Sequence, residues 1–184
     1  MNRFILTALP VAITLVYPLA VWLGHGTVEP RLFAALLVLA ASIRVATMKI
    51  GRAAWWWLAG ALALGTGAVM SNGWMPLKLY PVLVNAVMLG MFAYSLAMPP
   101  TFIERIARIK EPDLPSIAVA YTRRVTQVWC LFFLVNGSIA LLTAVWASPA
   151  TWSLYNGVIA YVLMGLLFAG EYLVRLRFKR RHNV

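Results

Sequence analysis

The sequence predicts an all-α fold, a polytopic integral membrane helical bundle of about six transmembrane helices, with one short amphipathic helix beside it. Two observations lead to this prediction. Of the 184 residues, 62% are hydrophobic and only 11% are charged, whereas about 25% of the residues in a soluble domain are charged. The chain also contains several apolar runs of about 18 residues or more, the length that a helix needs to cross a bilayer.

Six segments are expected to cross the membrane, and together they make one domain over residues 1–184. Five of them are long and apolar: 4–23, 53–70, 79–98, 125–146 and 152–170. The segment 32–48 is weaker, because it is short and contains Arg44 near one end. Its helix would still be about 25 Å long, and the long Arg44 side chain can extend to the nearby interface.

Basic residues are distributed unequally between the two sides of this map. All but two of the 16 Lys and Arg residues, Arg31 and Lys78, fall on the side that also holds both termini. Because cytoplasmic loops of membrane proteins carry the excess of Lys and Arg, we expect both termini in the cytoplasm. Without segment 32–48 the bias would disappear, so the charges support this span. Topology therefore explains the net charge of +11, and no nucleic-acid partner is expected.

The longest loop between spans is expected to contain the amphipathic helix, over 101–111. Phe102, Ile106 and Ile109 recur there at helical spacing, and Glu104 falls on the opposite face. Such a helix can lie in the membrane interface and contact lipid headgroups. Membrane lipids are therefore expected partners.

Two further features indicate anchoring or packing rather than a site. The tryptophans, among them Trp129, Trp146 and Trp152, are expected at the membrane interfaces, where an indole N–H stays hydrated. Gly165 and Ala169 form a small-xxx-small pair, which would let two helices approach closely.

The sequence predicts no catalytic, metal-binding or cofactor-binding set of residues. His25 and His182 stand apart from the Cys and carboxylate companions that a metal site needs. No Gly-rich phosphate loop or nucleophile elbow is present. Cys130 is the single cysteine, so an intramolecular disulfide is excluded. These absences lean against an enzyme.

A set of polar residues lies inside the expected spans. Tyr17, Asn85 and Asn156 are expected about 6–9 Å below the outer surface, and Asn136 deeper, near the middle of the membrane. Hydrogen bonds between helices explain isolated asparagines in membranes. Alternatively, the four side chains could converge on a cavity that is open to the outer leaflet.

Part of the chain, about residues 78–177, resembles a family of small bacterial inner-membrane proteins. The residues that carry the resemblance are Pro-Pro-Thr-Phe-Ile-Glu-Arg at 99–105, Tyr-Thr-Arg-Arg-Val-Thr at 121–126, Trp129, Asn136-Gly137, Tyr-Asn-Gly at 155–157 and Glu171-Tyr172. Members of that family are uncharacterised and are often encoded in aryl-polyene or xanthomonadin-type biosynthesis clusters, beside carrier proteins and acyltransferases. The resemblance implies the inner membrane and a lipid-like or polyene pathway, but no reaction.

This resemblance gives a possible role to a cytoplasmic rim of polar residues, which we predict from the charge pattern. Basic residues there could attract an acidic acyl carrier protein or a pathway enzyme, although topology alone also requires arginines at this place. Glu171, near the inner end of the last span, is expected to pair with a basic residue across the bundle. The rim consists of Glu104, Arg105, Arg123, Arg124, Thr126, Gln127 and Glu171.

Three functions remain open at this point. The first is a non-enzymatic accessory or scaffold protein that docks a carrier protein or pathway enzyme at the rim. The second is a small transporter or flippase for an amphipathic intermediate, which would use the asparagines. The third, an intramembrane acyl- or glycosyl-transferase, is disfavoured by the few acidic residues and histidines.

Overall fold

The structure, a computed structural model, describes residues 74–182 and the isolated positions 32, 35, 39, 63, 66, 67 and 70. Apart from these positions, the expected spans 4–23, 32–48 and 53–70 lie outside the described residues, and so does Tyr17. Within residues 74–182 all regular structure is helical. The predicted all-α class is confirmed for this part of the chain.

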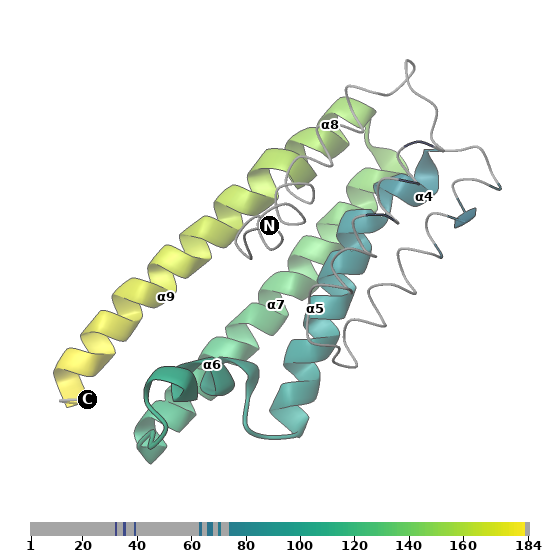
Figure 1. Cartoon of the computed structure of the whole chain (residues 1–184). Helices are drawn as coiled ribbons and strands as arrows, with labels where there is room; N and C mark the ends of the chain where they lie inside the picture. Colours follow the sequence, from purple (N-terminus) through teal and green to yellow (C-terminus); the bar gives the residue numbers. More distant parts are fainter. Residues whose placement is uncertain are drawn as a thin grey trace, which may run out of the picture.

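Seven helical elements follow one another along residues 74–182. In the numbering of Figure 1 they are α4 (Met75–Lys78), α5 (Tyr80–Ala97), α6 (Phe102–Lys110), α7 (Ser116–Trp146), α8 (Pro149–Leu154), the π-helix η1 (Tyr155–Ile159) and α9 (Ala160–His182). Three stretches of this part are long and apolar enough to cross a membrane, as expected of a multi-pass membrane protein. They are Met75–Ala97, Ser116–Trp146 and Pro149–Phe178.

Two of these helices extend well beyond the expected spans. Helix α7 begins at Ser116, directly after Pro115, and no helix breaker interrupts it before Trp146. Residues 121–124, which were expected in a loop, therefore lie in α7. Helix α9 continues to His182. Both helices are thus longer than the hydrophobic thickness of a bilayer.

The helices meet at two ends, which we name by their short helices. Figure 1 shows α5 and α7 running side by side in opposite directions, with α6 across their lower end and α9 on the other side of α7. The "α6 end" comprises α6, the start of α7 and the end of α9. The "α8 end" comprises α4, the end of α7 and α8.

The contact between α5 and α7, the "α5–α7 seam", forms the centre of the described part. Residues of α7 that are buried recur every three or four positions, so they share one face of the helix. This face is built from small, aromatic and polar residues, whereas large aliphatic side chains such as Leu131, Leu134 and Leu141 are exposed on the outside. The arrangement suits a helix in lipid, where close packing and hydrogen bonds, rather than aliphatic burial, hold helices together.

An aromatic cluster joins four helices near the α6 end of the seam. Phe92 of α5 stacks on Phe102 of α6, with ring centroids 4.4 Å apart, and meets Phe133 of α7 edge-on at 5.2 Å. Trp129 of α7 contacts Phe168 of α9 at 4.5 Å. Such pairs contribute beyond the area that they bury.

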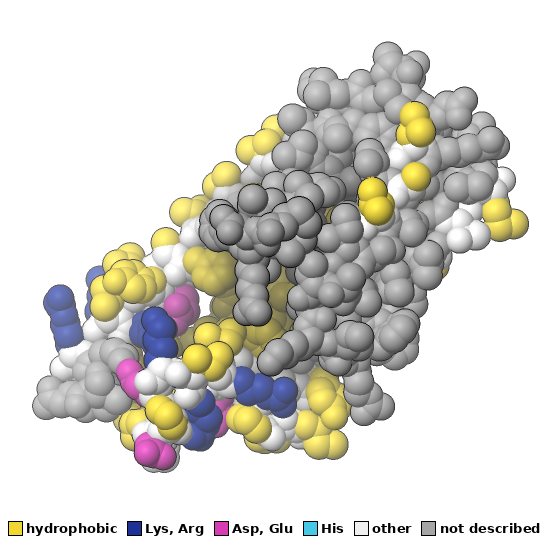
Figure 2. All heavy atoms as spheres, in the orientation of Figure 1, with side chains coloured by type: hydrophobic (Ala, Val, Ile, Leu, Met, Phe, Trp, Pro, Cys, Tyr) yellow, Lys and Arg dark blue, Asp and Glu magenta, His cyan; other side chains and the backbone are white. Residues whose placement is uncertain are grey.

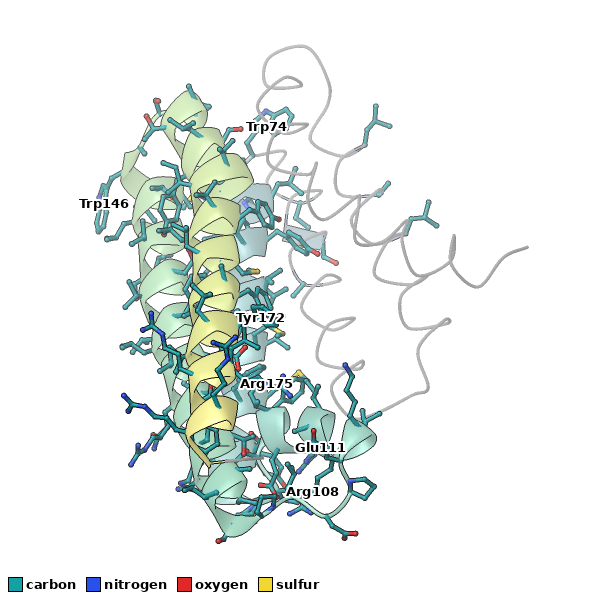
Figure 3. All side chains as sticks on the ribbon, turned by 90° about the vertical axis from the view of Figure 1, so that its left-hand side faces the viewer. Trp74, Arg108, Glu111, Trp146, Tyr172 and Arg175 are labelled. Atoms are coloured by element: carbon teal, nitrogen blue, oxygen red, sulfur yellow. The ribbon has the colours of Figure 1, made fainter. Side chains whose placement is uncertain are left out.

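The sequence predicts that the tryptophans act as interface anchors, but not all of the described ones do. Trp146 is 76% exposed, and Figure 3 shows it projecting from the bundle at the α8 end. Trp152 is fully buried. Its indole N–H donates to the carbonyl of Lys78 at 3.1 Å, and this bond connects α8 with α4. Trp129 is buried in the aromatic cluster. Trp129 and Trp152 therefore pack within the bundle, so the predicted anchoring role is wrong for them.

Among the described glycines, the tightest approach is at Gly137 and not at Gly165 of the predicted pair. Gly165 and Ala169 are exposed, and a Cβ on Gly165 would meet nothing within 4 Å. A Cβ on Gly137 of α7, in contrast, would lie 2.9 Å from the Cβ of Asn85 on α5. Gly137 is thus the residue that allows α5 and α7 to approach closely at this level.

Helix α6 faces the bundle with a different side from the expected one. Ile106 and Ile109 are exposed, whereas Glu104, predicted on the polar face, is buried and only 5% exposed. Phe102 and Ile103 are the apolar residues of α6 that pack against the aromatic core, Phe102 by stacking on Phe92. The reason is the start of the helix, where Glu104 closes a capping box with Thr101.

Candidate functional site

Two groups of polar residues are candidates for function, one within the α5–α7 seam and one at the α6 end. The first, the "asparagine layer", consists of Asn85, Asn136, Tyr155, Asn156 and Thr143. The second surrounds a cavity between α6, α7 and α9 and is called the "α6-end pocket" below.

Hydrogen bonds connect three helices in the asparagine layer. The Asn136 amide donates to Oδ1 of Asn85 at 3.1 Å, and the Tyr155 hydroxyl donates to Oδ1 of Asn136 at 2.8 Å. The Asn85 amide donates to the carbonyl of Pro81 at 2.8 Å within α5. The structure thus places Asn85 and Asn136 at one level, not at two. The expected offset was wrong because the helical stretch that contains Asn85 begins already at Met75.

The π-helix η1 supplies the third side of the layer. Tyr155 and Asn156 are consecutive, yet both are buried and both bond to α7, since a π-turn locally changes the helical spacing. The Asn156 amide donates to the hydroxyl of Thr143 at 3.2 Å and to the carbonyl of Trp152 at 2.9 Å. Within the described part of the chain, no buried side-chain N or O atom lacks a partner. These bonds favour the packing interpretation of the asparagines.

The predicted rim residues do not form one surface. Arg105, Arg123, Arg124 and Gln127 are exposed. Thr126 is completely buried, and its hydroxyl donates to the carbonyl of Thr122 at 2.8 Å. The other two residues of the predicted rim, Glu104 and Glu171, make different contacts, which are described in turn below.

Glu104 stabilises the α6 end of the bundle. Its Oε2 accepts the backbone N–H of Thr101 at 3.3 Å, and the Thr101 hydroxyl accepts the backbone N–H of Glu104 at 3.4 Å. Its other carboxylate oxygen pairs with Arg108 at 2.8 Å. Both carboxylate oxygens are thus engaged in holding the first turns of α6.

Two exposed arginines bond to backbone carbonyls at the C-terminal end of helix α5 and in the turn that follows it. Nε of Arg105 donates to the carbonyl of Pro100 at 2.9 Å, and one terminal nitrogen of Arg123 donates to the carbonyl of Leu96 at 3.2 Å. A guanidinium carries five N–H donors, so these bonds orient the groups and leave further donors. On the face shown in Figure 2, the coloured Lys and Arg side chains gather at the α6 end.

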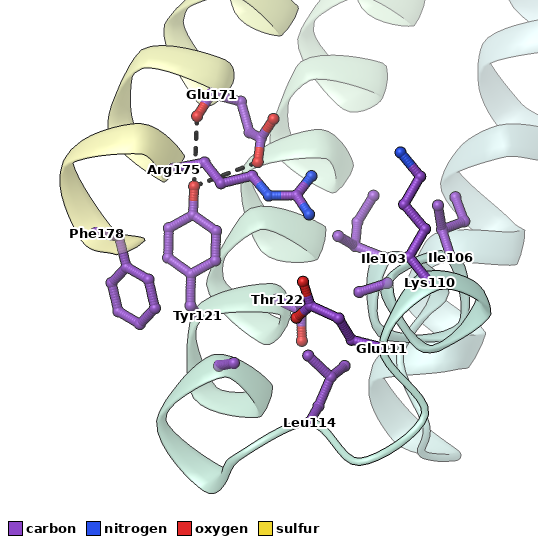
Figure 4. A pocket seen from close by; sticks show the side chains of 12 residues that line it. Ile103, Ile106, Lys110, Glu111, Leu114, Tyr121, Thr122, Glu171, Arg175 and Phe178 are labelled. Carbon is purple, nitrogen blue, oxygen red and sulfur yellow. Dashed lines mark hydrogen bonds between the residues drawn. The ribbon is translucent and has the colours of Figure 1, made fainter. Parts of the chain in front are cut away.

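The α6-end pocket is a cavity of about 150 Å³ between α6, α7 and α9 (Figure 4). Its apolar wall comprises Ile103, Ile106, Ala107, Leu114, Ala118 and Phe178. Its polar wall comprises Lys110, Glu111, Tyr121, Thr122, Glu171 and Arg175. An apolar hollow with a few converging polar groups is the usual form of a ligand site.

At the edge of the pocket Glu171 bonds to Tyr121, and to no arginine among the described residues. The Tyr121 hydroxyl is 3.3 Å from Oε1 of Glu171 and 3.4 Å from its carbonyl oxygen, and the Tyr121 ring stacks on Phe178 at 4.7 Å. Among the described residues, Glu171 has no ion pair. The expected salt bridge is therefore absent there, and α7 and α9 are joined by this tyrosine instead.

Sequence reasoning missed several residues of both groups. Tyr155 and Gly137 were noticed only within the resembling segments, although Gly137 shares the 3–4 spacing of the buried face of α7. Tyr121 and Arg175 were not predicted as site residues, because the helices that carry them extend beyond the apolar runs.

No group of three or more His, Cys, Asp or Glu residues that could hold a metal ion occurs in the part that the structure describes.

No protein-family model, curated protein or solved structure matches this chain. The resemblance to inner-membrane proteins of pigment clusters therefore stays a prediction.

Proposed function

We propose that the protein is a non-enzymatic accessory protein of the bacterial inner membrane, whose α6 end faces the cytoplasm and docks an acidic partner. The partner we infer is an acyl carrier protein or another enzyme of a lipid or aryl-polyene pathway. The observation that carries this proposal is that exposed arginines of α6 and α7 bond to the end of α5 and to the turn that follows it. Arg105 and Arg123 are held by backbone carbonyls and keep donors directed outward.

Electrostatic attraction of this kind has two consequences. Complementary charge raises the rate of encounter and fixes orientation, and oriented arginines bind carboxylates more specifically than disordered ones because less side-chain freedom is lost. The same residues support a cytoplasmic position of the α6 end, because this end holds most of the described Lys and Arg residues.

The test uses the full chain in lipid nanodiscs and a purified acyl carrier protein. We expect Arg123→Ala with Arg124→Ala to weaken binding about tenfold, and we expect binding to weaken as salt rises. The matched control is Arg180→Ala with Arg181→Ala, which removes the same charge from the same end of the bundle, but from α9 and not from the arginines of α6 and α7. Equal losses in the two double variants, or no loss in the first, would contradict the docking proposal.

The two other functions have less support from the described residues. A transporter that uses the asparagines needs them to face a passage, whereas Asn85, Asn136 and Asn156 are buried and bonded within the bundle. Normal export by Asn85→Leu and Asn156→Leu would remove that candidate. A transferase would rely on the few acidic residues, of which Glu104 is engaged in capping α6.

A further inference from the structure

The α6-end pocket lies at the level where the helices leave the hydrocarbon layer. From Pro149, at the other end of the third candidate span, to Glu171 the helix rises about 33 Å. The hydrocarbon core of a bilayer is about 30 Å thick. With the α8 end at one surface, Glu171 and the pocket around it are therefore at the level of the lipid headgroups at the other surface.

The charges that line this pocket balance each other. Lys110 and Arg175 are cationic, and Glu111 and Glu171 are anionic. Figure 4 shows Arg175 extending from α9 across the pocket toward α6, so that its guanidinium lies away from the backbone of its own helix. The Tyr121 hydroxyl is bonded to Oε1 of Glu171. The second oxygen of this carboxylate can accept another donor.

Such a balanced lining favours a ligand that carries both charges. A phosphate is attracted by Arg175 and Lys110, because guanidinium and ammonium groups form charge-assisted hydrogen bonds with it. A ligand with only negative charge would also face two carboxylates, which repel it. An ammonium group beside the phosphate removes this penalty, since it can donate to Glu171.

We propose that the α6-end pocket binds the phosphoethanolamine headgroup of a membrane phospholipid. Arg175 and Lys110 hold the phosphate, and Glu171, oriented by Tyr121, accepts a hydrogen bond from the ammonium group. Ile103 and Leu114 contact the glycerol and the first methylenes. The volume of about 150 Å³ resembles that of a protein cavity that accepts a benzene-sized group, so the pocket takes a headgroup and not a whole lipid. This site does not depend on the proposed docking of a carrier protein.

The test measures which lipids the purified full chain retains in detergent, by native mass spectrometry. Phosphatidylethanolamine, phosphatidylcholine and phosphatidylglycerol with the same acyl chains are offered at equal concentration. Phosphatidylcholine has the same phosphate but no N–H donor, so we expect retention of phosphatidylethanolamine to exceed it about tenfold. Equal retention of these two lipids, or preference for phosphatidylglycerol, would overturn the proposal.

Variants then assign the two halves of the headgroup to residues. Arg175→Gln should lower retention of phosphatidylethanolamine and phosphatidylcholine alike, whereas Glu171→Gln should remove mainly the preference between them. The matched control is Arg177→Gln, an exposed arginine on the same helix that does not line the pocket. Unchanged lipid retention in Arg175→Gln would contradict the assignment. Circular dichroism checks folding, and the exposed Lys110→Gln replaces Arg175→Gln if that variant unfolds.

A soluble competitor distinguishes a lipid from a free phosphate compound. Free O-phosphoethanolamine lacks the acyl chains that hold the headgroup at the interface, so we expect it to displace phosphatidylethanolamine only at concentrations at least a hundredfold higher than the lipid's own. Displacement at equal concentration would reassign the pocket to a soluble ligand and overturn the lipid proposal.

Discussion

Along the α5–α7 seam, polar side chains bond to one another and leave no room, whereas at the α6 end polar side chains surround a cavity of about 150 Å³. Asn85 and Asn136 are hydrogen-bonded in the seam, and the helices can approach this closely because Gly137 has no Cβ. Tyr121 and Glu171 also join two helices, but α7 and α9 stay far enough apart for a hollow between them.

With the pocket at the headgroup level, as inferred above, the difference between the two regions has a physical reason in the depth of their polar residues. In the hydrocarbon layer an amide without a hydrogen-bond partner costs free energy, so helices pack closely enough for each donor to find a partner within the protein. In the headgroup layer water and lipid can serve as partners, so charged side chains can surround a space. Substitutions in the seam should therefore reduce stability, and substitutions at the pocket should mainly change binding.

The largest loss of stability is expected for Trp129→Ala. This ring lies against Phe92 of α5 and Phe168 of α9, so its removal leaves a cavity between three helices. We expect the free energy of unfolding to fall by about 3 kcal/mol, measured by SDS titration of the protein in mixed micelles. The exposed Trp146→Ala is the control and should change it little; equal losses would contradict the role of the cluster.

A smaller loss is expected for Gly137→Ala. The added Cβ would lie 2.9 Å from the Cβ of Asn85, which is fixed to the backbone of α5, so the helices must move apart. Such overpacking costs about 1–3 kcal/mol in the same titration. Gly165→Ala, where nothing lies within 4 Å, should be neutral. The interpretation of the seam is wrong if the two alanines behave alike.

The bond between Asn85 and Asn136 should appear as a coupling energy. A double-mutant cycle with Asn85→Ala and Asn136→Ala is expected to give about 1 kcal/mol, within the range for hydrogen bonds between membrane helices. Asn136→Ala with Ser138→Ala is the control cycle, because Ser138 is exposed and bonds only to the carbonyl of Leu134 among the described residues. Additive effects of the two asparagines would argue for a lined cavity instead.

At the α6 end, Glu104→Ala should cost about 1 kcal/mol, since it removes one half of the capping box and the pair with Arg108. Glu104→Gln should cost less, because glutamine also closes a capping box. Protease cleavage within α6, together with the titration, would measure both. An equal effect of alanine and glutamine would show that capping is not the role of Glu104.

The smallest effect on stability is expected for Tyr121→Phe. The two bonds of the hydroxyl are 3.3 and 3.4 Å long and lie at the edge of the cavity, while the ring and its stacking on Phe178 are kept. The free energy of unfolding should fall by about 0.5 kcal/mol. A loss as large as that of Gly137→Ala would remove the distinction between the seam and the pocket.

Apolar runs predicted three of the described helices but not their ends. Segments 125–146 and 152–170 lie within long helical stretches of the structure, and segment 79–98 does so except for Met98, which follows the end of α5. Helices α7 and α9 continue into charged sequence, because no proline interrupts them and Arg and Lys are good helix formers, whereas hydropathy registers only the apolar part. Tyr121 and Arg175 belong to these extensions and were therefore outside any predicted site.

Composition and charge by themselves determined the helical class, the apolar spans and the polar residues that each span carries, because length, hydropathy and helical spacing are properties of the local sequence. The tertiary structure alone decided which polar residues meet. Asn136 bonds to Asn85 and Tyr155, and Glu171 bonds to Tyr121 and to no arginine in the part of the chain that the structure describes. Such pairs depend on the depth and rotation of one helix against another. Those are set by contacts between segments far apart in the chain, which no single segment encodes.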